Sequence, residues 1–323
     1  GRRAVETLQA AGDSSCAAAA LFNLGGLADA RDQVRQALVL WRRARRMMNT
    51  DDGLRLGVID GSLAGGLQAL GRFREARELY LRAASQLQEA GARTDALQLR
   101  LGLAEVQALL GEIGQALTEI HSVETVAVEL EDDNLLFEAR GLVARLELDL
   151  GHLDRSARLA EETIPRCERA GRLDDAARLA AIRALAIVGG AEGDPDSALA
   201  AAEAALGAAG LAVAAAVLRV ELTRSGRPFP TSRLRRDATL LDRSGLAIQA
   251  DLARLALAEA LFREGTTSAA AEACRQVLGR RHASVWPRLE AHRVLGEILA
   301  DHEPEAAAHH LRWSVRLAES VRG

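Results

Sequence analysis

The chain has 323 residues, 49% of them hydrophobic, and a formal net charge of −4. This nearly balanced charge argues against a nucleic-acid-binding protein, which usually carries a strongly basic domain. No run of about 18 apolar residues is present, so we expect a chain that does not span a membrane and lies in the cytoplasm.

The composition favours helix and excludes several kinds of catalytic site. Aromatic residues make up only 3%, and Ala and Leu, both strong helix formers, dominate the apolar residues. All 41 basic residues are Arg. A P-loop, a protein-kinase site and a Schiff-base enzyme each need a Lys, so none of them can be complete within these residues. We therefore predict no enzyme activity and no cofactor.

Along the chain, a short phrase recurs between two helical patterns. Each copy has a Gly and, five positions later, a small residue, as in Gly71 and Ala76. The Gly can adopt a positive φ and end the first helix, and the small residue lets the second helix pack close to the first. The copies span residues 71–76, 111–116, 151–156, 193–198 and 265–270, with a degenerate one at Gly226.

The second boundary of each unit carries residues suited to capping a helix. These residues lie at 50–53, 91–95, 131–134 and 171–174. Capping also accounts for the paired carboxylates Asp51-Asp52 and Asp132-Asp133 better than general acid–base chemistry does. Two helices of about 15 residues and two short turns then repeat about every 40 residues.

These units resemble tetratricopeptide repeats (TPR). The first unit carries Asn23-Leu24-Gly25 in its first helix and Ala37, Trp41 and Ala44 in its second. The equivalent second-helix positions of the next two units hold Ala76, Tyr80, Ala83, Ala116, Ile120 and Val123. The family's usual period is 34 residues. The longer period is similar to the repeats of bacterial STAND-type regulators and of the arms of CHAT-type (caspase-like) proteases.

The resemblance implies an all-α, right-handed α–α superhelix of about 7–8 antiparallel helix pairs. We expect TPR-like repeats over residues 1–206, beginning with a partial repeat, and further TPR-like helix pairs over residues 246–323. The residues between them, 207–245, contain Gly207, Gly210 and the sequence Arg-Pro-Phe-Pro at 227–230. We predict an irregular repeat or a bend there.

Candidate reactive groups are few. Cys16, Cys167 and Cys274 are far apart and form no CxxC motif, so we expect buried thiols in a reducing compartment. His302, His309 and His310 could gather near one turn, but their spacing does not support a metal site. We predict no catalytic and no metal-binding residues.

Arginine clusters are the remaining charged features: Arg42-Arg43-Arg45-Arg46, Arg233-Arg235-Arg236 and Arg280-Arg281. We interpret them mainly as solvated helix faces. An anionic partner surface is the alternative, and nucleic acid is disfavoured by the negative net charge.

In TPR proteins the first helix of each pair lines a concave groove, and the resemblance implies the same here. The stripe would mix both charge signs with amides, which suits a polar peptide or a folded partner. Carried over by position, the groove residues are Phe22, Asp29, Gln68, Gln98, Glu105, Glu138, Arg145, Asp149, Arg183, Glu259, Phe262 and Arg263.

We therefore predict a scaffold for protein–protein interaction. In detail, we expect a sensing or docking arm of a larger bacterial regulatory protein that holds a peptide or a folded partner in its groove. The alternative is the recognition arm of a CHAT-type protease whose catalytic domain lies outside these residues. Self-association of the array is also open.

Overall fold

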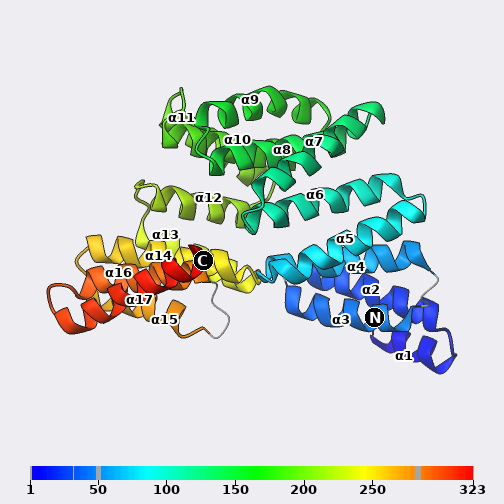
Figure 1. Ribbon diagram of the computed structural model, residues 1–323, viewed down its shortest axis with the longest axis horizontal. Coiled ribbons are helices and arrows are strands. Elements are labelled where there is room, and N and C mark those ends of the chain that lie inside the picture. Colours follow the sequence, from blue (N-terminus) through cyan, green and yellow to red (C-terminus); the bar gives the residue numbers. More distant parts are fainter. Residues whose placement is uncertain (1, 32, 49–51, 281–284, 323) are drawn as a thin grey trace. The chain divides into compact units, whose positions relative to one another are not determined.

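The computed structural model of the protein describes residues 2–31, 33–48, 52–280 and 285–322. The regular secondary structure of these residues is entirely helical, with seventeen helices and no strand (Figure 1). After α1, the helices form eight antiparallel pairs, which confirms the predicted all-α, TPR-like solenoid. Contacts divide the chain into two compact units, residues 1–211 and 212–323.

Unit 1 contains eleven helices in its described residues. They are α1 (Arg2–Ala10), α2 (Ser14–Asp29), α3 (Val34–Met47), α4 (Gly53–Ala69), α5 (Phe73–Glu89), α6 (Arg93–Leu109), α7 (Ile113–Glu129), α8 (Asp133–Asp149), α9 (Leu153–Arg169), α10 (Leu173–Gly189) and α11 (Pro195–Ala208). The helices α4, α6, α8 and α10 begin 40 residues apart and each has 17 residues, so the predicted period is confirmed.

Unit 2 contains the remaining helices. They are α12 (Ala212–Arg224), α13 (Thr231–Arg243), α14 (Ala247–Arg263), α15 (Thr267–Leu278), α16 (Val285–Leu299) and α17 (Pro304–Arg322). The helices α12 and α13, with 13 residues each, lie in the stretch that we predicted to be irregular. The division of the chain at residues 207 and 245 stays a prediction.

The glycine of the recurring phrase ends the first helix of a pair, as predicted. Gly71 has a φ of +74°, and Gly111 and Gly151 are similar. The Gly71 N–H donates to the Gln68 carbonyl (2.8 Å), and the Arg72 N–H donates to the Leu67 carbonyl (2.9 Å). These bonds satisfy carbonyls in the last turn of α4, in the manner of a Schellman motif.

Side-chain capping is confirmed at two of the four predicted boundaries, whereas the helices that begin at Arg93 and Leu173 have no side-chain cap, so the prediction is wrong there. The Asp52 carboxylate accepts from the Arg55 N–H (3.1 Å), and Asp132 accepts from the Leu135 N–H (3.1 Å). A side-chain acceptor here satisfies one of the free N–H groups of the first turn. Thr50 and Asp51, part of the first predicted turn, lie outside the described residues.

Two layers of helices make up each unit. Each of α4, α6 and α8 contacts the next even-numbered helix directly, and so do α12 and α14. Within the described residues, odd-numbered helices show no comparably close contacts with one another. The layer with the closer neighbours lies inside the curve of a solenoid, so we call the even-numbered helices inner helices and the odd-numbered ones outer helices.

Small residues allow the two layers to pack closely, as predicted. Ala76, Ala116 and Ser156, one in each of three successive outer helices, are fully buried. The Ser156 hydroxyl also donates to the Ala144 carbonyl of its own inner helix (2.7 Å). A larger side chain would push the axes of the paired helices apart.

Large side chains of the outer helices fill the space between successive inner helices. Tyr80 of α5 packs between α4 and α6. Its ring lies so close to Gly102 of α6 that a Cβ added to this glycine would come within 2.7 Å of the ring. The Tyr80 hydroxyl donates to Gln68 Oε1 of α4 (2.9 Å). Tyr80 thereby joins α4 to α6.

A buried carboxylate joins neighbouring helices through ion pairs. Asp60 of α4 is fully buried and forms ion pairs with Arg45 of α3 and with Arg82 of α5 (Nε to Oδ2, 3.0 Å). Unit 2 has a related network, in which Arg254 and Arg280 bind Asp242 and Asp251.

Candidate functional site

The inner helices of unit 1 present a continuous stripe of accessible side chains. On α6 the stripe contains Gln98, Gly102, Glu105 and Leu109, at the i, i+4, i+7 and i+11 positions of one helix face. These residues are exposed or half-buried, whereas Leu101, Leu103 and Ala104 between them are buried. We call the stripes of α4, α6, α8 and α10 together the inner face.

The same positions of α8, 40 residues later, hold Glu138, Leu142, Arg145 and Asp149, none of which is buried. Because α6 and α8 are in direct contact, equivalent positions on them are neighbours across the inner face. The structure thus brings together five of the predicted groove residues, the two on α6 and the three on α8. Their role in binding stays a prediction.

Charge on the inner face is mixed. Arg145 Nε lies 3.1 Å from Asp149 Oδ1 one turn away, and both side chains are more than a third exposed. Glu105 is exposed at the position equivalent to Arg145. Burial raises the pKa of the Tyr80 phenol, and the charge of Glu105 raises it further.

Glu138 belongs to an acidic group at the start of α8 and α10. Arg172, which precedes α10, lies 3.7 Å from Glu138 and 2.6 Å from Asp175, and it donates to Asn134 Oδ1 (2.6 Å). Burial raises the pKa of both Glu138 and Asp175, and the repulsion between these carboxylates adds to the rise at Glu138. One guanidinium therefore compensates several crowded carboxylates.

Other predicted groove residues of unit 1 lie beside the stripe or point away from it. Gln68 is engaged by Tyr80, and Arg183 forms an ion pair with Glu161 of the outer helix α9 (3.5 Å). The guanidinium of Arg183 is therefore directed toward the outer layer. Phe22 is half-buried, and Asp29 is exposed as the last residue of α2.

The three predicted residues of unit 2 lie on α14. Glu259 forms an ion pair with Arg293 of α16 (3.1 Å), and Arg263 Nε donates to the Glu259 carbonyl (3.3 Å). Phe262 is 40% exposed.

The sequence did not single out one side chain of the inner face. Arg178 of α10 is exposed at the position equivalent to Gln98 and Glu138. For Tyr80 of the outer helix α5, the sequence predicted a packing position but not the hydrogen bond to Gln68. Once the 40-residue register is fixed, counting 40 residues from Glu138 identifies Arg178.

The arginine clusters are only partly solvated. Arg42 and Arg46 are exposed, but Arg45 is bound to the buried Asp60. Arg280 is bound to Asp242 and Asp251, so its prediction as a solvated side chain is wrong. Arg281 lies outside the described residues.

The described histidines form no metal site of the usual kind. Within the described parts of the chain, no three His, Cys, Asp or Glu side chains are grouped to hold a metal ion. His292 and His310 instead face each other with their Nδ1 atoms 2.9 Å apart. Burial, together with the charge of His310, lowers the pKa of His292 to about 4.

The cysteines are free thiols. Cys167 and Cys274 are fully buried, as predicted, and burial raises the pKa of Cys274 to about 12. Cys16 is exposed, so the prediction of a buried thiol is wrong there. It lies in the first turn of α2, where few neighbouring side chains can cover it.

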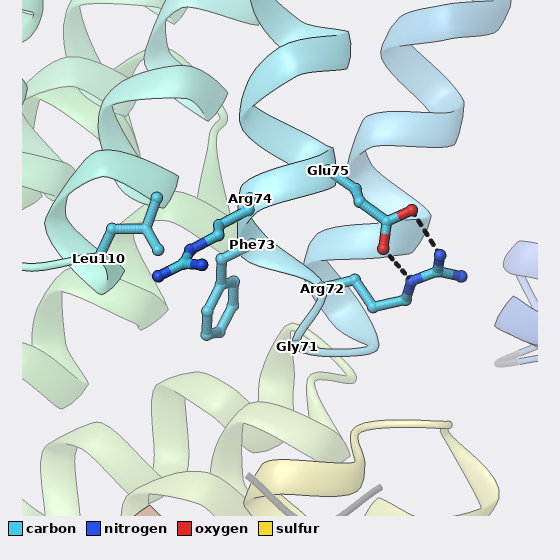
Figure 2. A pocket seen from close by; sticks show the side chains of 6 residues that line it. All are labelled: Gly71, Arg72, Phe73, Arg74, Glu75 and Leu110. Atoms are coloured by element: carbon cyan, nitrogen blue, oxygen red, sulfur yellow. Dashed lines mark hydrogen bonds and ion pairs between the residues drawn. The ribbon is translucent and has the colours of Figure 1, made fainter. Parts of the chain in front are cut away.

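A hollow of about 330 Å³ lies at the turn between α4 and α5 (Figure 2). Phe73, Arg74 and Leu110 line one part of it, and Arg72 is paired with Glu75 at the other. The hollow is on the turns and not on the inner face. It joins no group of reactive side chains, so we assign it no chemistry.

Comparisons with known proteins support the fold. No protein-family model matches the chain, and neither does any curated protein. Three solved structures are similar over most of their length.

The first of these structures is aspartyl phosphate phosphatase F from Bacillus subtilis, with a TM-score of 0.59 and 10% identity over 82% of this chain and 70% of that one. The second is a Rap protein complexed with Competence and Sporulation Factor, with a TM-score of 0.58 and 11% identity over 95% and 99%. The third is the apo form of RapI, with a TM-score of 0.57 and 10% identity over 84% and 98%.

At these identities the likeness establishes the helical-repeat fold alone. It does not extend to the specific comparison with STAND-type or CHAT-type proteins. Among the described residues, no helix combines the length and apolar character that crossing a bilayer requires.

Proposed function

We propose that this chain is a non-enzymatic module for protein–protein interaction, and that it binds a peptide or the surface of a partner along the inner face of unit 1. The observation that carries the proposal is the unbroken row of inner helices with equivalent, accessible side chains. Such rows form the extended concave binding surfaces of repeat proteins.

The side chains on this face suit a polar ligand. Gln98, Glu138 and Arg178 occupy one equivalent position on three successive helices. Glu105 and Arg145 occupy another, followed by the apolar Leu185. Because neighbouring helices carry charges of both signs, this face would select a ligand through complementary charges more than through burial of apolar surface.

The wider context is also part of the proposal. We place the chain in the sensing or docking arm of a larger bacterial regulatory protein in the cytoplasm, where free thiols such as its three cysteines persist. The similarity to a Rap protein that is complexed with a factor supports a binding role. The arm of a CHAT-type protease is the alternative, and a caspase-like domain in the full-length gene would favour it.

The test uses peptides selected from a random library displayed on phage, panned on the whole chain. Calorimetry then gives the dissociation constant of a selected peptide for the wild type, Glu105→Arg and Arg145→Glu. We expect at least one reversal to weaken binding about tenfold or more, because like charges then face each other.

Matched controls lie on α9, where Arg158 and Glu162 are exposed on an outer helix. Arg158→Glu and Glu162→Arg make the same changes in charge away from the inner face. Peptides that respond equally to both pairs of reversals, or to neither pair, would rule out the inner face as the binding surface.

A further inference from the structure

One face of the outer helix α3 is strongly basic. Arg35, Val39, Arg42 and Arg46 lie at the i, i+4, i+7 and i+11 positions of this helix, and all four are exposed. They lie on the side of α3 opposite the fully buried Ala37. We call these four residues the α3 stripe.

The charges of the α3 stripe are not balanced within the described residues. The helix α3 has five arginines and no acidic residue. Arg45 is paired with the buried Asp60, whereas Arg35, Arg42 and Arg46 form no ion pair with another described residue. The outer helices α5 and α9 also carry several arginines, but each has at least three acidic residues of its own. Their surfaces therefore mix both signs of charge, unlike that of α3.

The α3 stripe is unfavourable for α3 itself. Arg35 is the second residue of the helix, where the positive end of the helix dipole repels a cation. Arg42 and Arg46 are one turn apart, and like charges at this spacing repel each other. Carboxylates of another molecule lying along the stripe would relieve these repulsions.

The α3 stripe also has an apolar centre. Val39 is 63% exposed between Arg35 and Arg42. Protein–protein interfaces combine apolar contact with arginine, which is enriched in them. Contacts with nucleic-acid phosphates use charged and polar groups instead, and the net charge of −4 disfavours them further. These features favour a protein partner over a nucleic acid.

The spacing of the arginines suits a helical partner. Arg35 and Arg46 are eleven residues apart, which is about 16 Å along the helix axis. A second helix that lies antiparallel to α3 would face Arg46, Arg42 and Arg35 with its own positions i, i+4 and i+11. Its position i+7 would then face Val39.

We propose that the α3 stripe binds an acidic helix of another protein, with carboxylates on Arg35, Arg42 and Arg46 and an apolar residue on Val39. Because α3 is an outer helix, this surface lies away from the inner face of unit 1. The proposal therefore goes beyond the binding role proposed above and does not depend on it.

Fluorescence anisotropy with the whole chain and a designed peptide tests the proposal. The probe is an alanine-rich helical peptide with Glu at positions i, i+4 and i+11 and Leu at i+7. The control peptide has the same composition, with its Glu and Leu residues spread around the helix. We expect the probe to bind at least about tenfold more tightly than the control peptide, with an affinity that falls as salt is added.

Variants of the chain then locate the binding site. Arg42→Glu should raise the dissociation constant of the probe at least about tenfold, because like charges then face each other. Val39→Ser should raise it about threefold or more, which a purely electrostatic contact would not show. The matched control is Arg158→Glu, which makes the same change in charge on the outer helix α9 and should have no effect. All three side chains are exposed, so the variants should fold, as their circular dichroism would confirm.

Several outcomes would overturn the proposal. They are equal binding of the two peptides, no binding of the probe at micromolar concentrations, and an equal response to Arg42→Glu and Arg158→Glu. Tighter binding of a DNA duplex, or of vesicles of phosphatidylserine and phosphatidylcholine, than of the probe would assign the α3 stripe to phosphate groups instead.

Discussion

The buried carboxylate of Asp60 allows a sharp test of how adjacent repeats are joined. Its side chain is inaccessible to solvent, whereas those of Arg45 and Arg82 are 37% and 49% exposed. The three groups are therefore not equivalent. Either arginine can turn to water when its partner is lost, but the carboxylate of Asp60 cannot.

The asymmetry sets the expected magnitudes. Arg45→Ala/Arg82→Ala leaves a buried charge without a partner, which costs about 3–5 kcal/mol of unfolding free energy. Asp60→Leu removes the buried charge itself and leaves two arginines that water can reach. Replacing a buried ion pair by an apolar residue of similar size is often nearly neutral, so we expect a cost below about 1 kcal/mol.

Urea unfolding followed by tryptophan fluorescence measures the difference. Trp41 is buried on α3, the helix that carries Arg45, and reports on this part of unit 1. Trp286→Phe and Trp313→Phe remove the fluorescence of unit 2. Because repeat arrays can unfold in steps, the midpoint of the Trp41 transition is compared. An Asp60→Leu variant as destabilised as the double arginine variant would refute the reasoning.

Three further predictions concern packing, pH and catalysis. Gly102→Ala should lower the free energy of unfolding by about 1 kcal/mol, because overpacking against Tyr80 outweighs the gain in helix propensity. Gly141 has open space around it, so Gly141→Ala should raise the melting temperature. Because folding lowers the pKa of His292, this imidazole is protonated at a higher pH in the unfolded chain than in the folded chain. Thermal stability should then drop between about pH 6.5 and 4, and His292→Phe should flatten that drop. The chain should hydrolyse acetyl phosphate no faster than buffer does, and turnover abolished by a single substitution would contradict the non-enzymatic role.

The fold follows from the sequence because its signals are local. Gly71, Gly111 and Gly151 end helices through their own backbone conformation, and Asp52 and Asp132 cap the helices that follow them. These effects act within a few residues, so a pattern repeated every 40 residues is enough to reveal them.

The partners of long side chains could not be predicted in the same way. Periodicity gives the face from which a side chain starts, but an arginine reaches several ångströms beyond it. Arg45 and Arg280 therefore end in ion pairs with the buried carboxylates of Asp60 and Asp251, and Arg183 reaches α9. Tyr80 likewise crosses from the outer layer to Gln68, which only the helix packing reveals.

Photo-cross-linking of a selected peptide tests the binding role of the inner face most directly. Benzoylphenylalanine is placed at Leu142, on the inner face of α8, or at Leu81, which is 52% exposed on the outer helix α5. We predict that the peptide cross-links from position 142 and not from position 81. Cross-linking from position 81 alone would show that the ligand binds the outer layer and would contradict the account.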